Sequence, residues 1–187
     1  MNRIIDGSSG SDRPPQPVLQ RGRVRLRPTT GQDCAFAVEL EARPEHARHL
    51  GQWSEAQHRA CLDSPAWAHW ILEAAGSPIG LVILQDTDDP DGNVLLRRIV
   101  VDSKGRGHGR RAMELTMRYA FEILEFHRLW LYVGTTNRRA FGFYERLGFV
   151  HEGTARECSR EGNRRISMHI MSMLRTEYTR RTPPAGR

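Results

Sequence analysis

A run of alternating glycines between an apolar segment and an amphipathic segment constrains this chain more than any other feature. Ile99, Val100 and Val101 are consecutive β-branched residues, which are typical of a buried strand. Glycines follow at positions 105, 107 and 109, and from Arg110 onward apolar residues recur at helical spacing. The pattern predicts a strand, a glycine loop and a helix start in succession.

The predicted loop has the chemistry of an anion site. Glycine lets the backbone approach a ligand closely, and the first amides of a helix have no partner within that helix. The helix dipole favours negative charge at this end, and Arg106, Arg110 and Arg111 add positive charge. The glycine spacing fits neither a Walker loop nor a dinucleotide fingerprint. We therefore predict a phosphate or pyrophosphate cradle, with a plain turn as the alternative.

Length and composition restrict the class of protein. With 187 residues, 39% of them hydrophobic and 27% charged, the chain is expected to form one domain with its own core. No apolar run is long enough to cross a membrane and no apolar signal core is present at the N-terminus, so we expect no membrane partner. The widely spaced Cys34, Cys61 and Cys158 favour a cytoplasmic protein and argue against a disulfide framework or a structural zinc site.

The net charge of +6 raises the alternative of a nucleic-acid-binding protein. However, the 28 basic residues include a single lysine, Lys104, and the arginines are scattered without interleaved aromatic residues. An anionic ligand at the glycine loop accounts for the local basic cluster more simply. Nucleic-acid binding is kept as a hypothesis, and it would require strongly salt-dependent affinity.

Hydrophobic periodicity predicts a mixed α/β (α+β) fold. We expect residues 21–178 to form one domain, between a flexible N-terminal tail at 1–20 and a C-terminal tail at 179–187, where there is little to bury. The length of the connection favours parallel pairing of strands 95–101 and 128–133. The expected strands are 23–28, 68–74, 79–85, 95–101, 128–133, 150–157 and 165–174, and the expected helices are 34–41, 54–64, 110–125 and 137–147.

Two segments of the sequence resemble the acyl-CoA-binding motifs of the GNAT N-acetyltransferase superfamily. That family has Q/R-x-x-G-x-G/A after its fourth strand, and residues 104–109 match it except for the lysine in first position. The family's second segment is matched by N-x-x-A-x-x-x-Y-x-x-x-G-F at residues 137–149. Residues 152–175 further resemble the branch that contains ribosomal-protein N-terminal and spermidine acetyltransferases, and the resemblance spans about residues 23 to 178.

The resemblance implies a fold and a reaction. The fold would be a mixed, mostly antiparallel sheet of six to seven strands flanked by about four helices, in which the parallel pair 95–101 and 128–133 splays apart. The reaction would transfer an acetyl group from acetyl-CoA to a primary amine by direct attack in a ternary complex, without a metal. Acceptors in such families include protein N-termini, polyamines, lysine and amine antibiotics. The alternative is a GNAT-fold module that binds acyl-CoA without turnover.

The resemblance also implies roles for individual residues. The strand 99–101 would pair with the pantetheine arm of CoA, Asn137 would hydrogen-bond that arm, and Tyr144 would protonate the leaving thiolate. From spacing alone, core packing is the better interpretation of Tyr144 and a helix cap is a sufficient one for Asn137. The cofactor-binding residues implied are Ile99, Val100, Val101, Arg106, Gly107, His108, Gly109, Arg110, Arg111 and Asn137, with His108 alternatively a solvated loop residue.

The general base is not identified by the sequence. This family often places a carboxylate on the central strand, where this chain has Arg97 and Arg98. Asp102 at the strand end is more plausible as a turn residue, and bulk solvent is sufficient in principle. The remaining candidates lie on the closing hairpin and are His151, Glu152, Glu157 and His169.

Substrate preference and assembly are less constrained. The acidic turn 86–91 would attract a cationic substrate, although a solvated turn is the default interpretation. An open strand at the edge of a mixed sheet would support a homodimer. The acceptor amine, the identity of the acyl group and the role of the N-terminal segment do not follow from the sequence.

Overall fold

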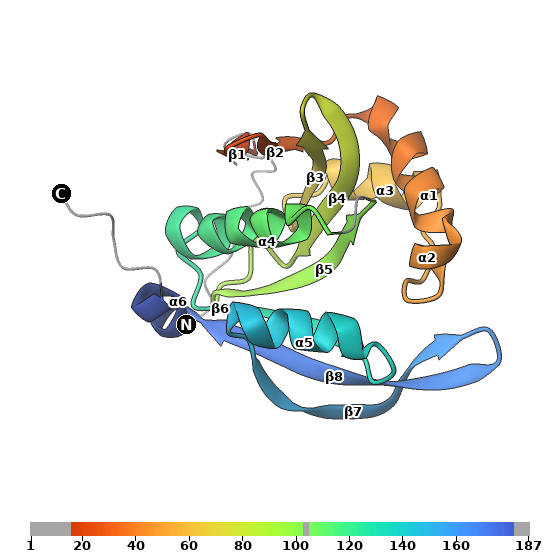
Figure 1. Cartoon of the computed structure of the whole chain (residues 1–187), viewed down its shortest axis with the longest axis vertical. Coiled ribbons are helices and arrows are strands. Elements are labelled where there is room, and N and C mark those ends of the chain that lie inside the picture. Colours follow the sequence, from red (N-terminus) through yellow and green to blue (C-terminus); the bar gives the residue numbers. More distant parts are fainter. Residues whose placement is uncertain (1–15, 103–104, 182–187) are drawn as a thin grey trace, which may run out of the picture.

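The computed structural model describes residues 16–102 and 105–181, over which the chain forms one eight-stranded sheet with helices on both faces (Figure 1). The sheet order is β1-β2-β3-β4-β5-β6-β8-β7, and every neighbouring pair is antiparallel except β5 and β6. The strands are β1 (Leu19–Arg21), β2 (Val24–Pro28), β3 (Trp67–Ala74), β4 (Ser77–Gln85), β5 (Asn93–Val101), β6 (Arg128–Gly134), β7 (Val150–Glu161) and β8 (Arg164–Leu174).

The helices lie close to the predicted ranges, with additional short ones. Ser54 caps α3 as its spacing from Gln57 suggests, because Gln57 N donates to Ser54 Oγ (3.3 Å) and Ser54 N donates to Gln57 Oε1 (2.8 Å). The helical elements are η1 (Gly31–Asp33), α1 (Cys34–Ala42), α2 (Pro44–Ala47), α3 (Glu55–Leu62), α4 (His108–Arg118), the π-helical turn η2 (Tyr119–Ile123), α5 (Arg138–Leu147) and α6 (Arg175–Arg181).

The predicted fold class is confirmed, and the counts are corrected. The sheet has eight strands over the described residues instead of six to seven, since Leu19 is buried and carries β1 inside the range expected to be a tail. The helix α6 was not expected, and it is held by Tyr178, whose ring stacks on Phe121 at 5.0 Å. Residues 1–15 and 182–187 of the expected tails lie outside the described residues.

The sheet is buried on both faces at its centre. In β4, Val82 and Leu84 face the core beneath α4 and α5, whereas Leu81 and Ile83 face α1. This two-sided burial explains why residues 81–84 of β4 are a continuous apolar run without alternation. No helix in the described part of the chain is long and apolar enough to cross a membrane.

The two parallel strands part halfway along their length. Their pairing runs from Asn93↔Arg128 to Leu96↔Leu131. Beyond that point β5 stays paired to β4 as far as Val101, and β6 stays paired to β8 as far as Gly134. The two strands therefore form a fork, and the predicted splay is confirmed.

A β-bulge lies at the base of this fork. In the pairing of β4 with β5, Ile83 is opposite Arg98 but Leu84 is opposite Leu96, so Arg97 is an extra residue on β5. A bulge bends the strand and redirects its side chains, and it commonly occurs beside functional sites. The bend coincides with the place where β5 leaves β6.

The close approach of β4 to the fork yields a first prediction. A Cβ on Gly80 would overlap the Val100 carbonyl oxygen and press on Val101 Cα. Gly80→Ala should therefore lower the free energy of unfolding by about 1–3 kcal/mol, as overpacking does. Gly153→Ala is the control, because a Cβ there meets nothing within 4 Å. Urea denaturation measures both, and equal effects of the two changes would contradict the close contact.

Candidate active site

A cleft of about 760 Å³ opens at the fork on the side of the sheet that carries α1–α3. It is lined by the α2–α3 loop (48–53), by β5 (95–98), by the β6–α5 segment (between 132 and 137) and by the tip of the β7–β8 hairpin (between 158 and 168). Figure 1 shows this hairpin extending past α5 toward the side of α2. The volume suits a small-molecule ligand.

The predicted glycine loop leads into α4 as expected, with Lys104 outside the described residues. Gly105 (φ +83°) and Gly107 (φ +72°) are left-handed, and Gly107 is the N-cap of α4. The helix begins with a bond from Arg111 N to Gly107 O (3.1 Å), so the amides of residues 108–110 precede the first bond within the helix. A Cβ at either glycine would meet no atom within 4 Å, so backbone conformation rather than space requires glycine here.

The side chains around this loop leave its outer surface positive. Arg106, Arg110 and Arg111 are exposed, while His108 and Gly109 are half-buried at the start of α4. Arg110 Nε donates to Glu114 Oε1 (3.1 Å) and Arg111 Nη1 donates to the Arg106 carbonyl (3.4 Å). The helix dipole, the backbone amides of the first turn and the arginines together give the loop the electrostatics of an anion cradle.

Residues 99–101 of β5 connect the cradle to the cleft. Ile99 and Val101 pack toward α4, and Val100 is buried against α1. One backbone edge pairs with β4, and the other edge faces the fork beyond the last pair with β6. An unpaired strand edge can hydrogen-bond an extended ligand as another strand would.

Asn137 lines the cleft, whereas Tyr144 does not. The Oδ1 of Asn137 accepts a bond from Ala140 N (3.1 Å), which confirms the cap interpretation and leaves the Nδ2 group outside that bond. Tyr144 is 8% exposed and packs against the rings of Phe143 and Phe149. Burial raises the pKa of the Tyr144 phenol above its usual value.

None of the predicted base candidates belongs to the described lining of the cleft. Asp102 is ion-paired with Arg43 (2.6 Å), and His169 Nδ1 bonds with Thr154 Oγ1 (2.9 Å). Glu152 is bound to Arg128 and Ser172, and His151 and Glu157 are exposed on β7.

The histidine that does line the cleft is His49 from the α2–α3 loop. The sequence did not single it out, because no motif or periodicity marks a loop histidine.

Arg98 forms the buried floor of the cleft and rests on a carboxylate behind it. Its side chain is 5% exposed, and its Nη1 lies 3.3 Å from Glu41 Oε1, which is itself fully buried on α1. The other Glu41 oxygen accepts a bond from Trp53 N (3.2 Å), and the Trp53 ring lies 4.3 Å from Arg98 Cζ. Burial and the charge of Arg97 lower the pKa of Arg98, against the opposing effect of Glu41.

Behind Glu41, buried polar side chains form a chain of contacts that runs through His58 and His69 to Thr29. His58 Nε2 lies 3.6 Å from Glu41 Oε1, and His58 Nδ1 is 3.0 Å from His69 Nε2. His69 Nδ1 bonds with Thr29 Oγ1 (2.8 Å). His58 and His69 are almost fully buried, so these polar contacts hold α1, α3 and β3 together behind the cleft.

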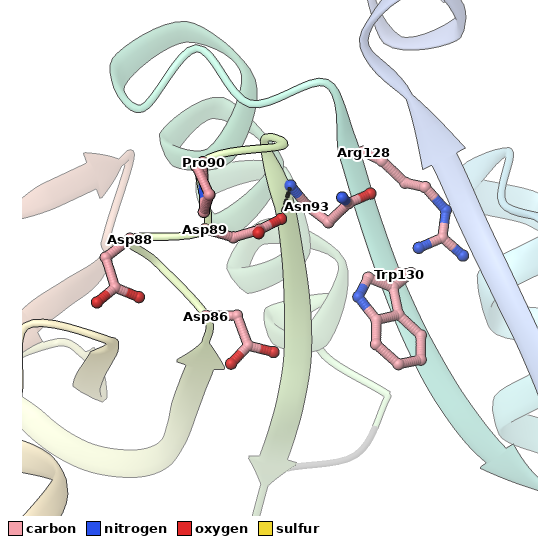
Figure 2. Close-up of a pocket in the computed structure, with 7 residues that line it drawn as sticks. All are labelled: Asp86, Asp88, Asp89, Pro90, Asn93, Arg128 and Trp130. Atoms are coloured by element: carbon pink, nitrogen blue, oxygen red, sulfur yellow. Dashed lines mark hydrogen bonds between the residues drawn. The ribbon is translucent and has the colours of Figure 1, made fainter. Parts of the chain in front are cut away.

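A second, acidic groove of about 660 Å³ lies at the other end of β5, near Asn93 (Figure 2). Figure 2 shows Asp86, Asp88 and Asp89 on the loop after β4, with Arg128 and Trp130 of β6 on the other side of β5. Asp89 Oδ2 accepts a bond from Asn93 N (2.7 Å), as expected for a turn. The acidic turn therefore lies apart from the cleft at the fork.

One group of side chains has the composition of a metal site. Glu45, His46 and Asp102 bring their potential ligand atoms within 4.8 Å of one another. Arg43 Nη1 lies 2.6 Å from Asp102 Oδ2, so Asp102 is also part of an ion pair. The expectation of no metal stays a prediction.

Known proteins are similar to this chain in sequence and in fold. The family profile described as "Acetyltransferase (GNAT) domain" matches residues 23–150. The spermidine N(1)-acetyltransferase of Escherichia coli K12 is 26% identical over 141 residues, which cover 70% of this chain and 74% of that protein.

Two crystal structures of the Vibrio cholerae spermidine/spermine acetyltransferase resemble this structure. The complex with CoA and spermine gives a TM-score of 0.75 at 23% identity and covers 83% of this chain and 98% of that one. The complex with manganese ions gives 0.73 at 24% identity, covering 86% and 97%. At this level of identity the likeness establishes the fold.

The buried histidine chain predicts a pH dependence of stability. Burial, with smaller contributions from His58 and Arg98, lowers the pKa of His69 from 6.5 to about 3. Between these values the unfolded chain binds a proton that the folded chain does not, so stability falls as pH falls below 6.5, by up to about 1.4 kcal/mol per pH unit. His69→Gln should remove this part of the slope.

Urea denaturation at several pH values from 7 to 4 measures the effect for both proteins. The exposed His127 provides the matched control, and His127→Gln should keep the wild-type slope. If the free energy of unfolding of wild type and His69→Gln has the same dependence on pH, His69 binds its proton in the folded protein as readily as in the unfolded chain, which would contradict the lowered pKa.

Proposed function

The chain belongs to the GNAT acetyltransferase family, and from this membership we propose that it transfers the acetyl group of acetyl-CoA to a primary amine. The observation that carries the proposal is the fork between β5 and β6. An anion cradle lies beyond one end of the forked part of β5, and a small-molecule cleft lies at the other end. A phosphate-bearing cosubstrate and an acceptor would thus approach the fork from different sides.

In this proposal the cofactor follows β5. The pyrophosphate of CoA binds the loop and the first turn of α4, through the backbone of residues 106–111 and the charges of Arg106, Arg110 and Arg111. The pantetheine arm pairs with the free edge of Ile99–Val101, and the Nδ2 group of Asn137 donates to it. These assignments account for the glycine conformations and for the unpaired strand edge.

The reaction is direct transfer. The neutral amine nitrogen attacks the thioester carbonyl carbon, a C–N bond forms, and backbone N–H groups of β5 stabilise the oxyanion. The C–S bond then breaks, the thiolate takes a proton from the Tyr144 hydroxyl, the proton lost by the amine passes to solvent, and the tyrosinate takes a proton back from solvent. Tyr144 lies seven residues after Asn137, which is about two turns along the same face of α5.

The raised pKa of the Tyr144 phenol is compatible with its proposed role as proton donor. It keeps the phenol protonated at neutral pH, which is the form that a proton donor needs. The alternative, a module that binds acyl-CoA without turnover, has the same cradle and fork. The two functions differ only in whether bound acetyl-CoA gives up its acetyl group to an amine.

The cradle can be tested by titration. Calorimetry should give a dissociation constant for acetyl-CoA of about 1–100 µM. Gly107→Ala should weaken binding by about fivefold or more, because alanine at φ +72° costs about 1–2 kcal/mol and the free loop relieves this strain by leaving the conformation that binds. Gly153→Ala serves again as the control and should bind like wild type. Undetectable binding by the wild type would refute both the transferase and the binding-module proposals.

Turnover is tested by the release of free CoA thiol with a panel of primary amines. The panel contains spermidine, lysine, a peptide with a free N-terminus and an aminoglycoside. We expect release above the hydrolytic background with at least one amine class. Acetyl-CoA binding without release on any amine would favour the binding module.

The role of Tyr144 is tested by Tyr144→Phe. This change should lower kcat by about 100-fold or more while the affinity for acetyl-CoA stays unchanged, because only the proton donor is removed. Tyr178→Phe is the control, since it also removes a partly buried tyrosine hydroxyl, the one bonded to Glu122. An unchanged kcat of Tyr144→Phe would leave Tyr144 as a core residue and would not affect the proposed reaction.

A further inference from the structure

The wall of the cleft is positively charged. Arg48 enters from the α2–α3 loop, Arg160 from the tip of the β7–β8 hairpin, and Arg97 and Arg98 from β5. Aspartate and glutamate are absent from the lining that the structure describes. The cradle proposed for the CoA phosphates lies beyond Val101, so the exposed Arg48, Arg97 and Arg160 can serve another anion, while Arg98 is ion-paired with Glu41.

The bulge on β5 brings two of these arginines to the same side. Neighbouring residues of a regular strand point to opposite faces of the sheet, so adjacent arginines would normally be separated. Here the Cζ atoms of Arg97 and Arg98 lie 5.9 and 4.3 Å from the centre of the same ring, that of Trp53. The bulge therefore concentrates positive charge at the point where β5 leaves β6.

Arg98 is incompletely compensated. Its side chain is only 5% exposed, and its Nε atom has no hydrogen-bond partner among the described residues. Glu41 is its ion-pair partner on one side only, through Nη1. A buried guanidinium beside a second one destabilises the empty site, and an incoming anion would relieve that repulsion.

From this arrangement we propose that the acceptor is a small amine that also carries a carboxylate or a phosphate, bound by the arginines of the cleft wall. Arg97 is exposed and would contact the anionic group directly, while Arg98 adds charge from beneath, held by Glu41 and Trp53. Guanidinium groups match both anions in geometry. The inference rests on the proposed function, because it assigns the acceptor of that reaction.

The positive charges of the cleft wall also affect how the acceptor amine loses its proton without a general base. A positive wall lowers the pKa of a bound ammonium, so the acceptor loses its proton to solvent more readily. A carboxylate on β5 would have the opposite effect on the bound amine. The arginine pair thus favours an anionic acceptor over a polycation such as spermidine, on which the Escherichia coli relative is named to act.

Matched pairs of amines test the proposal. The rate of thiol release at saturating acetyl-CoA is compared for 4-aminobutyrate and 1,4-diaminobutane, and for O-phosphoethanolamine and 1,2-diaminoethane. We expect kcat/KM for the better anionic amine to exceed that of its diamine by about tenfold or more, equivalent to one charge-assisted contact. The two pairs distinguish a carboxylate site from a phosphate site.

Variants of Arg97 test whether the arginines of the cleft wall cause a preference for anionic amines. Arg97→Gln should raise KM for the preferred anionic amine by about tenfold, with the affinity for acetyl-CoA unchanged. Arg97→Glu should shift the preference toward the diamine. Arg23 is an exposed arginine at the start of the distant strand β2, and Arg23→Gln should behave as wild type.

The outcomes separate this inference from the proposed function. Thiol release with diamines or spermidine as efficient as with their anionic counterparts would overturn the anionic acceptor and leave the acetyltransferase intact. If no amine releases thiol, the same pairs are titrated into the CoA-saturated protein. Tighter binding of the anionic member, lost in Arg97→Gln, then supports the anion site, and equal binding overturns it.

Discussion

The site depends on how β5 and β6 are held apart. Each strand is bound along its whole length to an outer neighbour, β5 to β4 and β6 to β8, while the two pair with each other only as far as Leu96 and Leu131. The unpaired backbone edge this creates would normally invite another strand. Because α1 packs on one face and α4 and α5 on the other, the edge is held open inside the molecule, which is the edge that we propose pairs with the pantetheine arm.

Local signals predicted the glycine loop, the helix after it and the cap of α5 well. The glycine positions, the helix that follows and the capping role of Asn137 each depend on neighbours within a few residues, so periodicity and turn chemistry are sufficient to find them. The short strand β1 was assigned to a tail because its evidence is a single buried leucine in a polar stretch. The splay of β5 from β6 came from the family resemblance and not from the residues themselves.

The acceptor side could not be predicted, since it is assembled from segments far apart in the chain. Glu41 and Arg98 are separated by more than fifty positions, and nothing local in either segment indicates that they meet. Alternation along β5 would place Arg97 and Arg98 on opposite faces, and only the pairing with β4 reveals the bulge between them. The candidate bases on the closing hairpin lie outside the described lining of the cleft for the same reason, and Glu152 is ion-paired with Arg128 on β6.

The fork also explains how one fold can serve acceptors of different charge. The cradle and the free strand edge use backbone groups and a helix dipole, which tolerate substitution of most side chains. The cleft uses side chains at the bulge, in the α2–α3 loop and at the tip of the β7–β8 hairpin, and these can change without disturbing the cofactor. A relative that acetylates spermidine and a chain whose cleft is lined with arginine are therefore compatible with one family, because family membership follows the cofactor and acceptor choice follows the cleft.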